Sequence, residues 1–303
     1  MSLAALGLMA WGCGSESASA DGVGGVAGGG GAGAAGADAG CTGDPSPQAR
    51  CIKSVSGRVV DGQGSGIGKL LMSVCGSICY YGETEANGAF NVAVGARLDP
   101  AQYSTLPHGR PDRTNFYFQL PDSAADDFVA GDLLSLALPS GGEALVVKSD
   151  QNGAPAQSVT HAGVTLDVPA GVVVKIDVED IALGSDGKLF RALRVDAAQH
   201  AAFVQPSMNV VELFHFTPFE TRFQDDQGKP TKVQLSFPAP AGFAAGEAVE
   251  VLALGSYLYP EWLTPARFEL IATAKVSTDG TRVDMDPGQG IEYLTWVGLR
   301  KKP

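Results

Sequence analysis

The sequence predicts an all-β protein: two tandem antiparallel β-sandwich domains of a Greek-key-like type, which follow a disordered Gly/Ala tether. Glycine and proline are abundant, with 40 and 18 copies in 303 residues, and only 18% of the residues are charged. Turn formers are therefore plentiful, whereas good helix formers are scarce. Short segments of alternating apolar and polar residues recur along the chain, and no segment shows the 3.6-residue periodicity of an amphipathic helix.

The charge balance excludes one class of partner. The chain has 21 lysines and arginines against 33 aspartates and glutamates, a net charge of −12. Proteins that bind DNA or RNA draw most of their non-specific affinity from basic side chains. We therefore expect no nucleic-acid partner.

The first thirteen residues are interpreted as an export signal. The apolar run from Leu3 to Trp11 is much shorter than the roughly 20 residues of a membrane-spanning helix, and it is typical of the hydrophobic region of a signal peptide. The residues that precede Cys13 resemble a bacterial lipobox, in which the cysteine is lipidated. Residues 1–13 are thus predicted to be a truncated-looking lipoprotein signal peptide with Cys13 as its lipidation site. The alternative is a short uncleaved hydrophobic tail.

Residues 14–50 are predicted to be a disordered linker. Ten of the 40 glycines lie between Asp21 and Gly40, and most of the other residues there are alanine. Such a stretch cannot bury enough apolar surface to offset the entropy lost on ordering. A flexible tether of this kind would hold a folded part away from a membrane.

The odd number of cysteines agrees with a lipid anchor. If Cys13 carries lipid, the other four of the five cysteines can form two disulfides in an oxidising compartment. Three pairings are open, and we favour Cys41 with Cys51 and Cys75 with Cys79, because a turn would bring the last two together. Metal binding is disfavoured, since the spacing of Cys75 and Cys79 is not that of zinc ligands.

Residues 51–150 are predicted to form the first sandwich. Alternation before a Gly-rich turn indicates a strand around residues 54–60. Further strands are expected at residues 70–75, 90–94, 115–120 and 133–138. The segments SGRVVD (56–61) and TEANGAF (84–90) resemble those of the carboxypeptidase regulatory-like (transthyretin-like) domain. This resemblance covers residues 51 to about 96, and it implies a structural or adhesive module.

Residues 156–300 are predicted to form the second sandwich. Strands are expected at residues 164–168, 172–178, 233–237, 249–254, 268–276, 283–285 and 291–297, separated by turn signals. The opening segment GVTLDVPAG (163–171) resembles the β-sandwich module shared by zonula occludens proteins, ankyrins and netrin receptors. The resemblance implies a module that mediates contacts.

One tripeptide in the second domain has a possible catalytic reading. Relatives of that module cleave themselves at a His-Phe-Ser site, and this chain carries His215, Phe216 and Thr217. A threonine hydroxyl beside a base could replace the serine, so His215 and Thr217 are the weak catalytic candidates. The alternative is that the alternation around His215 marks one face of a half-buried strand.

Other chemistry has little support in the sequence. The four histidines lie far apart, and no usual hydrolase or metal-binding motif is present, so we expect no cofactor and no metal. The remaining enzyme option is a pair of carboxylates flanking a cleft, with candidates at Asp126/Asp127, Glu179/Asp180, Asp225/Asp226 and Asp284/Asp286. The last pair together with Asp279 could form at most a weak calcium site.

An aromatic loop is the main candidate for ligand binding. Tyr257, Tyr259 and Trp262 lie within six residues of one another, and rigid aromatic side chains often anchor binding partners. The same residues could instead cap the edge of a sandwich.

Together these features predict a lipid-anchored structural or ligand-binding (adhesion-type) protein of the bacterial cell envelope, without catalytic activity. We expect it at the outer membrane or cell surface, attached to the membrane through its lipid and contacting an unknown protein or glycan. The alternative is an envelope enzyme, either autoproteolytic at Phe216-Thr217 or an accessory hydrolase that acts on surface polysaccharide.

Overall fold

The structure is a computed structural model that describes residues 41–99, 104–108, 112–117, 120, 126–147, 155–196, 199 and 204–303. The predictions for the signal peptide, for Cys13 and for the tether up to residue 40 lie outside the described residues. Within the described part, no helix is long and apolar enough to cross a membrane.

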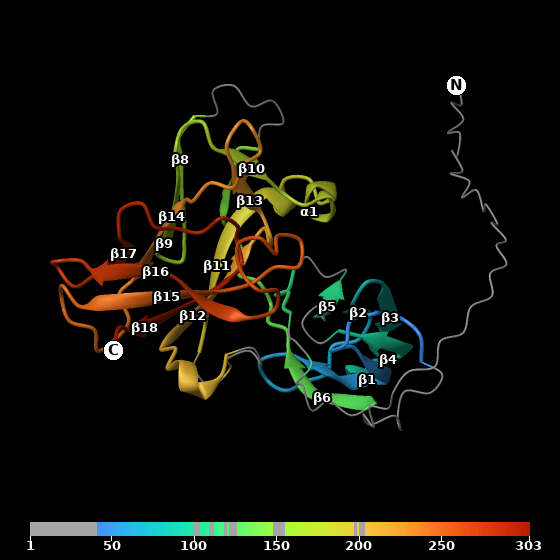
Figure 1. Ribbon diagram of the computed structural model, residues 1–303. Helices are drawn as coiled ribbons and strands as arrows, with labels where there is room; N and C mark the ends of the chain where they lie inside the picture. The colour runs from blue at the N-terminus through green and yellow to red at the C-terminus, as the bar shows by residue number, and fades with distance from the viewer. Residues whose placement is uncertain are drawn as a thin grey trace, which may run out of the picture. The chain divides into compact units, whose positions relative to one another are not determined.

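The N-terminal strands form two three-stranded sheets, with the orders β4-β1-β6 and β3-β2-β5 (Figure 1). Their bounds are β1 (Arg50–Val60), β2 (Leu71–Cys75), β3 (Cys79–Glu83), β4 (Ala89–Leu98), β5 (Ser104–His108) and β6 (Asp127–Leu134). In β4 the alternation of the sequence is realised directly, because Phe90, Val92 and Val94 are all buried. The turn at Asn87 and Gly88 precedes this strand, as predicted, and Gly88 has a positive φ of 83°.

The C-terminal strands form one large antiparallel sheet with the order β7-β11-β12-β18-β15-β16-β17-β14-β9-β8. Their bounds are β7 (Glu143–Ala144), β8 (Gln157–His161), β9 (Val164–Val168), β11 (Leu189–Val195), β12 (Glu212–Thr217), β14 (Gln234–Pro238), β15 (Ala248–Leu254), β16 (Phe268–Val276), β17 (Arg282–Met285) and β18 (Trp296–Lys301). Smaller elements are the β10 (Val173–Lys175) and β13 (Arg222–Gln224) ribbon, the helix α1 (Val178–Ala182), and the 3-10 helices η2 (Asp186–Lys188) and η4 (Pro206–Met208).

The large sheet is nearly closed into a barrel, which corrects the prediction of a plain sandwich for this part of the chain. Side chains from β8 bridge the gap between the two ends of the sheet. The Gln157 amide accepts the Val146 N–H at 2.9 Å and donates to the Val146 carbonyl oxygen at 3.3 Å. The His161 Nδ1 accepts the N–H of Ala192 at 3.1 Å. These bonds satisfy edge groups that an open sheet would leave unpaired.

Two hydrophobic cores lie on opposite faces of this barrel wall. One fills the barrel and includes Phe214 and Phe216 of β12. The other joins Leu213 of β12 and Trp296 of β18 to side chains of the N-terminal sheets, such as Met72. All six residues of β12 are therefore buried, whereas a half-buried strand was expected around His215.

The segment at residues 115–120 is not a strand in its described part, contrary to the prediction. The Asn115 backbone instead pairs with side chains of the barrel: its N–H donates to the Nε2 of His215 at 3.3 Å, and its carbonyl oxygen accepts the Nε1–H of Trp296 at 2.6 Å. The strand predicted at residues 133–138 is also displaced, because β6 ends at Leu134.

The two disulfides join Cys41 to Cys51 and Cys75 to Cys79, which is the pairing that the sequence favours. The second closes the β2–β3 hairpin, where Cys75 and Cys79 are directly paired residues.

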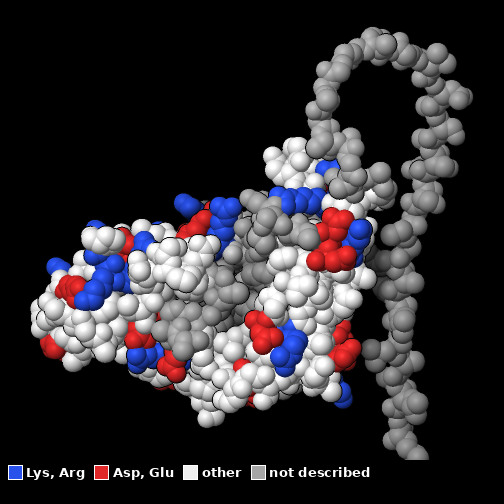
Figure 2. Space-filling model, turned by 90° about the horizontal axis from the view of Figure 1, so that it is seen from below, with Lys and Arg blue, Asp and Glu red and all other residues white. Residues whose placement is uncertain are grey.

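On the face shown in Figure 2, positive and negative side chains are interspersed among mostly uncharged residues.

Candidate functional site

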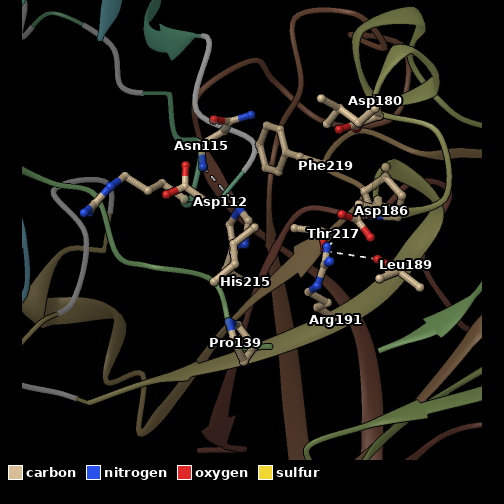
Figure 3. Close-up of a pocket in the computed structure, with 15 residues that line it drawn as sticks. Asp112, Asn115, Pro139, Asp180, Asp186, Leu189, Arg191, His215, Thr217 and Phe219 are labelled. Atoms are coloured by element: carbon tan, nitrogen blue, oxygen red, sulfur yellow. Dashed lines mark hydrogen bonds between the residues drawn. The ribbon is translucent and has the colours of Figure 1, made fainter. Parts of the chain in front are cut away.

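A cavity of about 280 Å³ opens where the chain around residues 112–115 meets the wall of the barrel. Figure 3 shows His215 and Asn115 on one side of it and Asp180, Asp186 and Arg191 on the other. The lining residues come from four stretches of the chain: Asp112, Arg113, Asn115, Leu138, Pro139, Asp180, Leu183, Asp186, Gly187, Leu189, Arg191, His215, Thr217, Pro218 and Phe219.

Strand β12 places His215 and Thr217 on the cavity side of the barrel. Successive residues of a strand point to opposite faces, so Phe214 and Phe216 enter the barrel core while His215 and Thr217 line the cavity. The neighbouring strand β11 brings Arg191 opposite Thr217. The antiparallel pairing of two buried strands thus fixes this side of the site.

The imidazole of His215 is buried, with only 1% of the residue exposed. Its ring stacks on that of Phe219 at a centroid distance of 5.4 Å and meets Trp296 edge-on at 4.8 Å. Burial lowers the pKa of His215 to about 3, because the charged form is disfavoured away from water. The ring is therefore neutral at physiological pH.

The tautomer of this neutral ring follows from its contacts. The backbone N–H of Asn115 can only donate, so Nε2 of His215 is the acceptor and Nδ1 carries the proton. Among the described residues, none accepts a hydrogen bond from this Nδ1. A buried donor without an acceptor costs about 1–3 kcal/mol, so the cavity holds a polar group that a ligand oxygen could satisfy.

Thr217 and Arg191 form the adjoining wall. The hydroxyl of Thr217 donates to the carbonyl oxygen of Leu189 at 3.2 Å. The guanidinium of Arg191 donates through Nε to the Gly141 carbonyl oxygen at 2.9 Å and through Nη1 to that of Asp186 at 3.3 Å. The Thr217 hydroxyl is therefore bonded to the Leu189 backbone, whereas the His215 ring is bonded to the Asn115 backbone.

The segment of α1 and η2 supplies the acidic wall. Asp180 and Asp186 line the cavity together with the half-exposed Leu183. Gly187 lets the turn fold tightly, because a Cβ at this position would lie 1.7 Å from the carbonyl oxygen of Asp180. Asp180 belongs to one of the carboxylate pairs found in the sequence, whereas Asp186 and Arg191 were missed because no local motif distinguishes them.

A second polar cluster lies beneath the aromatic loop, centred on Glu220. The residue is 7% exposed, and the Ser256 hydroxyl donates to its carboxyl. Burial is the main cause that raises the pKa of Glu220 to about 7, offset in part by hydrogen bonds from Ser256 and Tyr117. Glu220 also has a positive φ of 61°, which is uncommon for a side chain of this size. Sequence reasoning did not single it out.

The aromatic candidates pack inward over this cluster. The Tyr257 ring meets Tyr117 edge-on at 5.3 Å, and Trp262 meets Tyr293 edge-on at 4.7 Å. Tyr259 also packs on Tyr293. All three loop side chains are partly buried, so in this structure the loop covers an end of the barrel.

The acidic pairs of the sequence do not gather in one place. Asp284 pairs with Arg282, the Thr273 hydroxyl donates to Asp286, and Asp279 binds groups of its own turn. Asp126 pairs with Lys53. Among the described residues no group of three or more His, Cys, Asp or Glu side chains is arranged to hold a metal ion.

Comparison with known proteins identifies no family: no protein-family model matches the chain, and no curated protein is significantly similar to it in sequence. The two family resemblances noted in the sequence therefore stay predictions.

Proposed function

We propose that this chain is a lipid-anchored, non-catalytic ligand-binding protein of the bacterial cell envelope, and that the cavity beside β12 is its binding site. The observation that carries the proposal concerns His215, which lines the cavity and whose buried Nδ1–H has no acceptor in the part of the chain that the structure describes. Binding sites typically combine an apolar cavity with a few directed polar groups.

The chemistry of the cavity favours binding over catalysis. A general base works best when its pKa lies near the operating pH, whereas burial holds the pKa of His215 at about 3. The Thr217 hydroxyl directs its proton to the Leu189 carbonyl oxygen, and an activated nucleophile would need to direct it to a base. These contacts argue against self-cleavage between Phe216 and Thr217.

The location at the outer membrane or cell surface is proposed from the sequence. A lipid on Cys13, followed by the Gly/Ala-rich linker, would hold the folded part off the membrane. The two disulfides are consistent with an oxidising compartment. Metabolic labelling with a fatty acid tests the anchor: we expect the native chain to be labelled and Cys13→Ser to remain unlabelled, and an unlabelled native chain would refute it.

The domain resemblances support an adhesion-type role. We propose that residues 51–96 belong to a carboxypeptidase regulatory-like domain and that the segment opening at residue 163 derives from the module of zonula occludens proteins, ankyrins and netrin receptors, remodelled into the barrel-like sheet. Both kinds of module usually mediate contacts.

Incubation of the purified chain with surface glycans separates binding from catalysis. The proposal expects retention of the protein on immobilised glycan, no new reducing ends, and one full-length band on a denaturing gel. New reducing ends that disappear in Asp284→Asn or Asp286→Asn, or a fragment that begins at Thr217, would instead establish the enzyme alternative.

A further inference from the structure

We infer that the cavity beside β12 recognises an uncharged polyhydroxyl ligand the size of one sugar ring. The inference rests on the proposed binding function and adds the chemical class of the ligand to it.

The cavity presents polar groups of two kinds to a ligand. His215 offers one uncharged donor, its buried Nδ1–H. Asp180 and Asp186 lie across the cavity from His215 (Figure 3). An ionised carboxylate accepts hydrogen bonds and cannot donate them. A hydroxyl group both donates and accepts, so one ligand with several hydroxyls can form hydrogen bonds with both sides of the cavity.

The charged residues that line the cavity favour an uncharged ligand. Three carboxylates (Asp112, Asp180 and Asp186) and two guanidinium groups (Arg113 and Arg191) line the cavity. An anion would meet the carboxylates, and Arg191 already donates to two carbonyl oxygens. A cation would meet the guanidinium groups and the N–H of His215. A mixed lining of this kind favours a neutral ligand over either ion, because each charge on a ligand would face groups of its own sign.

The size of the cavity and its apolar walls suit one sugar ring. A volume of about 280 Å³ lies just below the range of roughly 300–1,000 Å³ that is typical of drug-sized ligands. Phe219, Pro218, Pro139 and Leu183 line the cavity between the polar groups. They can cover the C–H faces of a ring while its hydroxyls reach the polar side chains. Such a ligand can be a free sugar or the terminal residue of a glycan.

The test is a titration of the full-length chain, monitored by the ring ¹H–¹⁵N signal of His215. The probes are D-glucose, D-galactose and D-mannose, with D-glucuronic acid and D-glucosamine as charged counterparts. We expect at least one neutral hexose to shift the Nδ1–H signal, and its charged counterparts to bind at least about tenfold more weakly. Oligosaccharides that end in the same hexose distinguish a glycan terminus from a free sugar, since a glycan receptor would bind them at least as tightly.

Variants locate the binding. Asp186 is exposed on η2, so Asp186→Asn is expected to fold normally and to weaken hexose binding about tenfold or more, the usual effect of losing a charged hydrogen-bond acceptor. The matched control is Asp226→Asn, an exposed turn carboxylate outside the cavity, which should bind like the native chain. His215→Phe retains a ring of similar shape and should lose binding. Its binding is measured by isothermal titration calorimetry, because the variant has no His215 signal, and circular dichroism confirms its fold.

The outcomes distinguish the two levels of the proposal. If the charged probes shift the His215 signal and the neutral hexoses do not, the cavity is a binding site but the inference of an uncharged sugar is wrong. If no probe of either kind shifts the signal, the sugar inference fails. A fragment library that also leaves the signal unchanged would then refute the proposed binding function itself.

Discussion

Glu220 illustrates how burial alters a single residue. Its carboxyl lies under the aromatic loop, where the Ser256 and Tyr117 hydroxyls contact it. Asp177 raises its pKa further, and Arg222 stacks on the nearby ring of Tyr259 at 4.7 Å. Protonation avoids an unpaired buried charge, so this carboxyl is kept as an acid in the folded chain at mildly acidic pH.

A pH dependence of stability follows from this carboxyl. The folded pKa of about 7 lies above the ordinary value of 4.5. Between these values the folded state keeps a proton that the unfolded chain releases. The stabilisation is therefore complete below pH 4.5 and is lost as the pH rises through 7, by about 3 kcal/mol in all. Urea denaturation at pH 4.5 to 8 should show this loss in the native chain.

The matched variants isolate Glu220 from other titrating groups. Glu220→Gln keeps the shape of the side chain without ionising. The slope of its free energy of unfolding against pH should therefore lack the contribution of this carboxyl. Glu143→Gln changes an exposed carboxyl on β7 and should keep the native slope. Equal slopes for the native chain and Glu220→Gln would show that Glu220 is not the group responsible.

At the scale of elements, the strands of the barrel divide into those that sequence reasoning could find and those that it could not. The strand predicted at residues 268–276 coincides with β16, and those at 164–168 and 249–254 match β9 and nearly match β15. In contrast, β11 was missed. The alternation around His215 revealed a strand, but it could not reveal that a second core covers the outer face of β12. Such burial depends on partners about 100 residues away, such as Asn115.

The candidate site was harder to predict for the same reason. His215 and Thr217 were noted for a tripeptide, and Asp180 for a pair of acids. Their meeting in one cavity depends on the register of β11 with β12 and on the fold of the α1–η2 turn. Neither feature leaves a local pattern in the sequence.

The α1–η2 turn should be sensitive to one methyl group. In Gly187→Ala the added Cβ would lie 1.7 Å from the Asp180 carbonyl oxygen, so the backbone must move. We expect the free energy of unfolding to fall by about 1–3 kcal/mol, as measured by urea denaturation. Ser185→Ala is the control, since this neighbouring serine makes no side-chain capping bond and should change stability by less than about 0.5 kcal/mol. Equal stability in both variants would contradict the proposed close packing.

The contact between the two ends of the barrel sheet, called the seam below, should depend on His161. Its Nδ1 accepts the Ala192 N–H, and its Nε2 faces the Ser140 carbonyl oxygen at 3.4 Å. His161→Ala removes the acceptor, so hydrogen exchange of the Ala192 amide should accelerate about tenfold, corresponding to a lost bond of about 1–1.5 kcal/mol. Thr160→Ala on the same strand should leave this amide unchanged. Unaltered exchange in His161→Ala would mean that the seam closes without it.

At the scale of the whole molecule, the main question is whether the N-terminal sheets and the barrel fold independently. The sequence suggests two tandem domains. In the structure, the described residues from 41 onward belong to one compact unit, and one of the two cores combines Met72 and Phe90 with Leu213 and Trp296. A core shared in this way exposes apolar surface on both parts if either unfolds alone, which is costly.

We therefore predict that residues 41–303 unfold in a single cooperative transition. Trp296 links the two parts most directly, because its indole N–H donates to the Asn115 carbonyl oxygen and its ring belongs to the shared core. Trp296→Ala should lower the stability of both parts together by about 3–5 kcal/mol. Trp262→Ala should leave the coupling intact, because Trp262 packs against the barrel core and not against the shared core. Calorimetry of each variant, with near-UV circular dichroism as a second probe, measures the number of transitions. Two separate transitions in the native chain would show that each part is stable alone, because a shared core that contributes several kcal/mol forces them to unfold together.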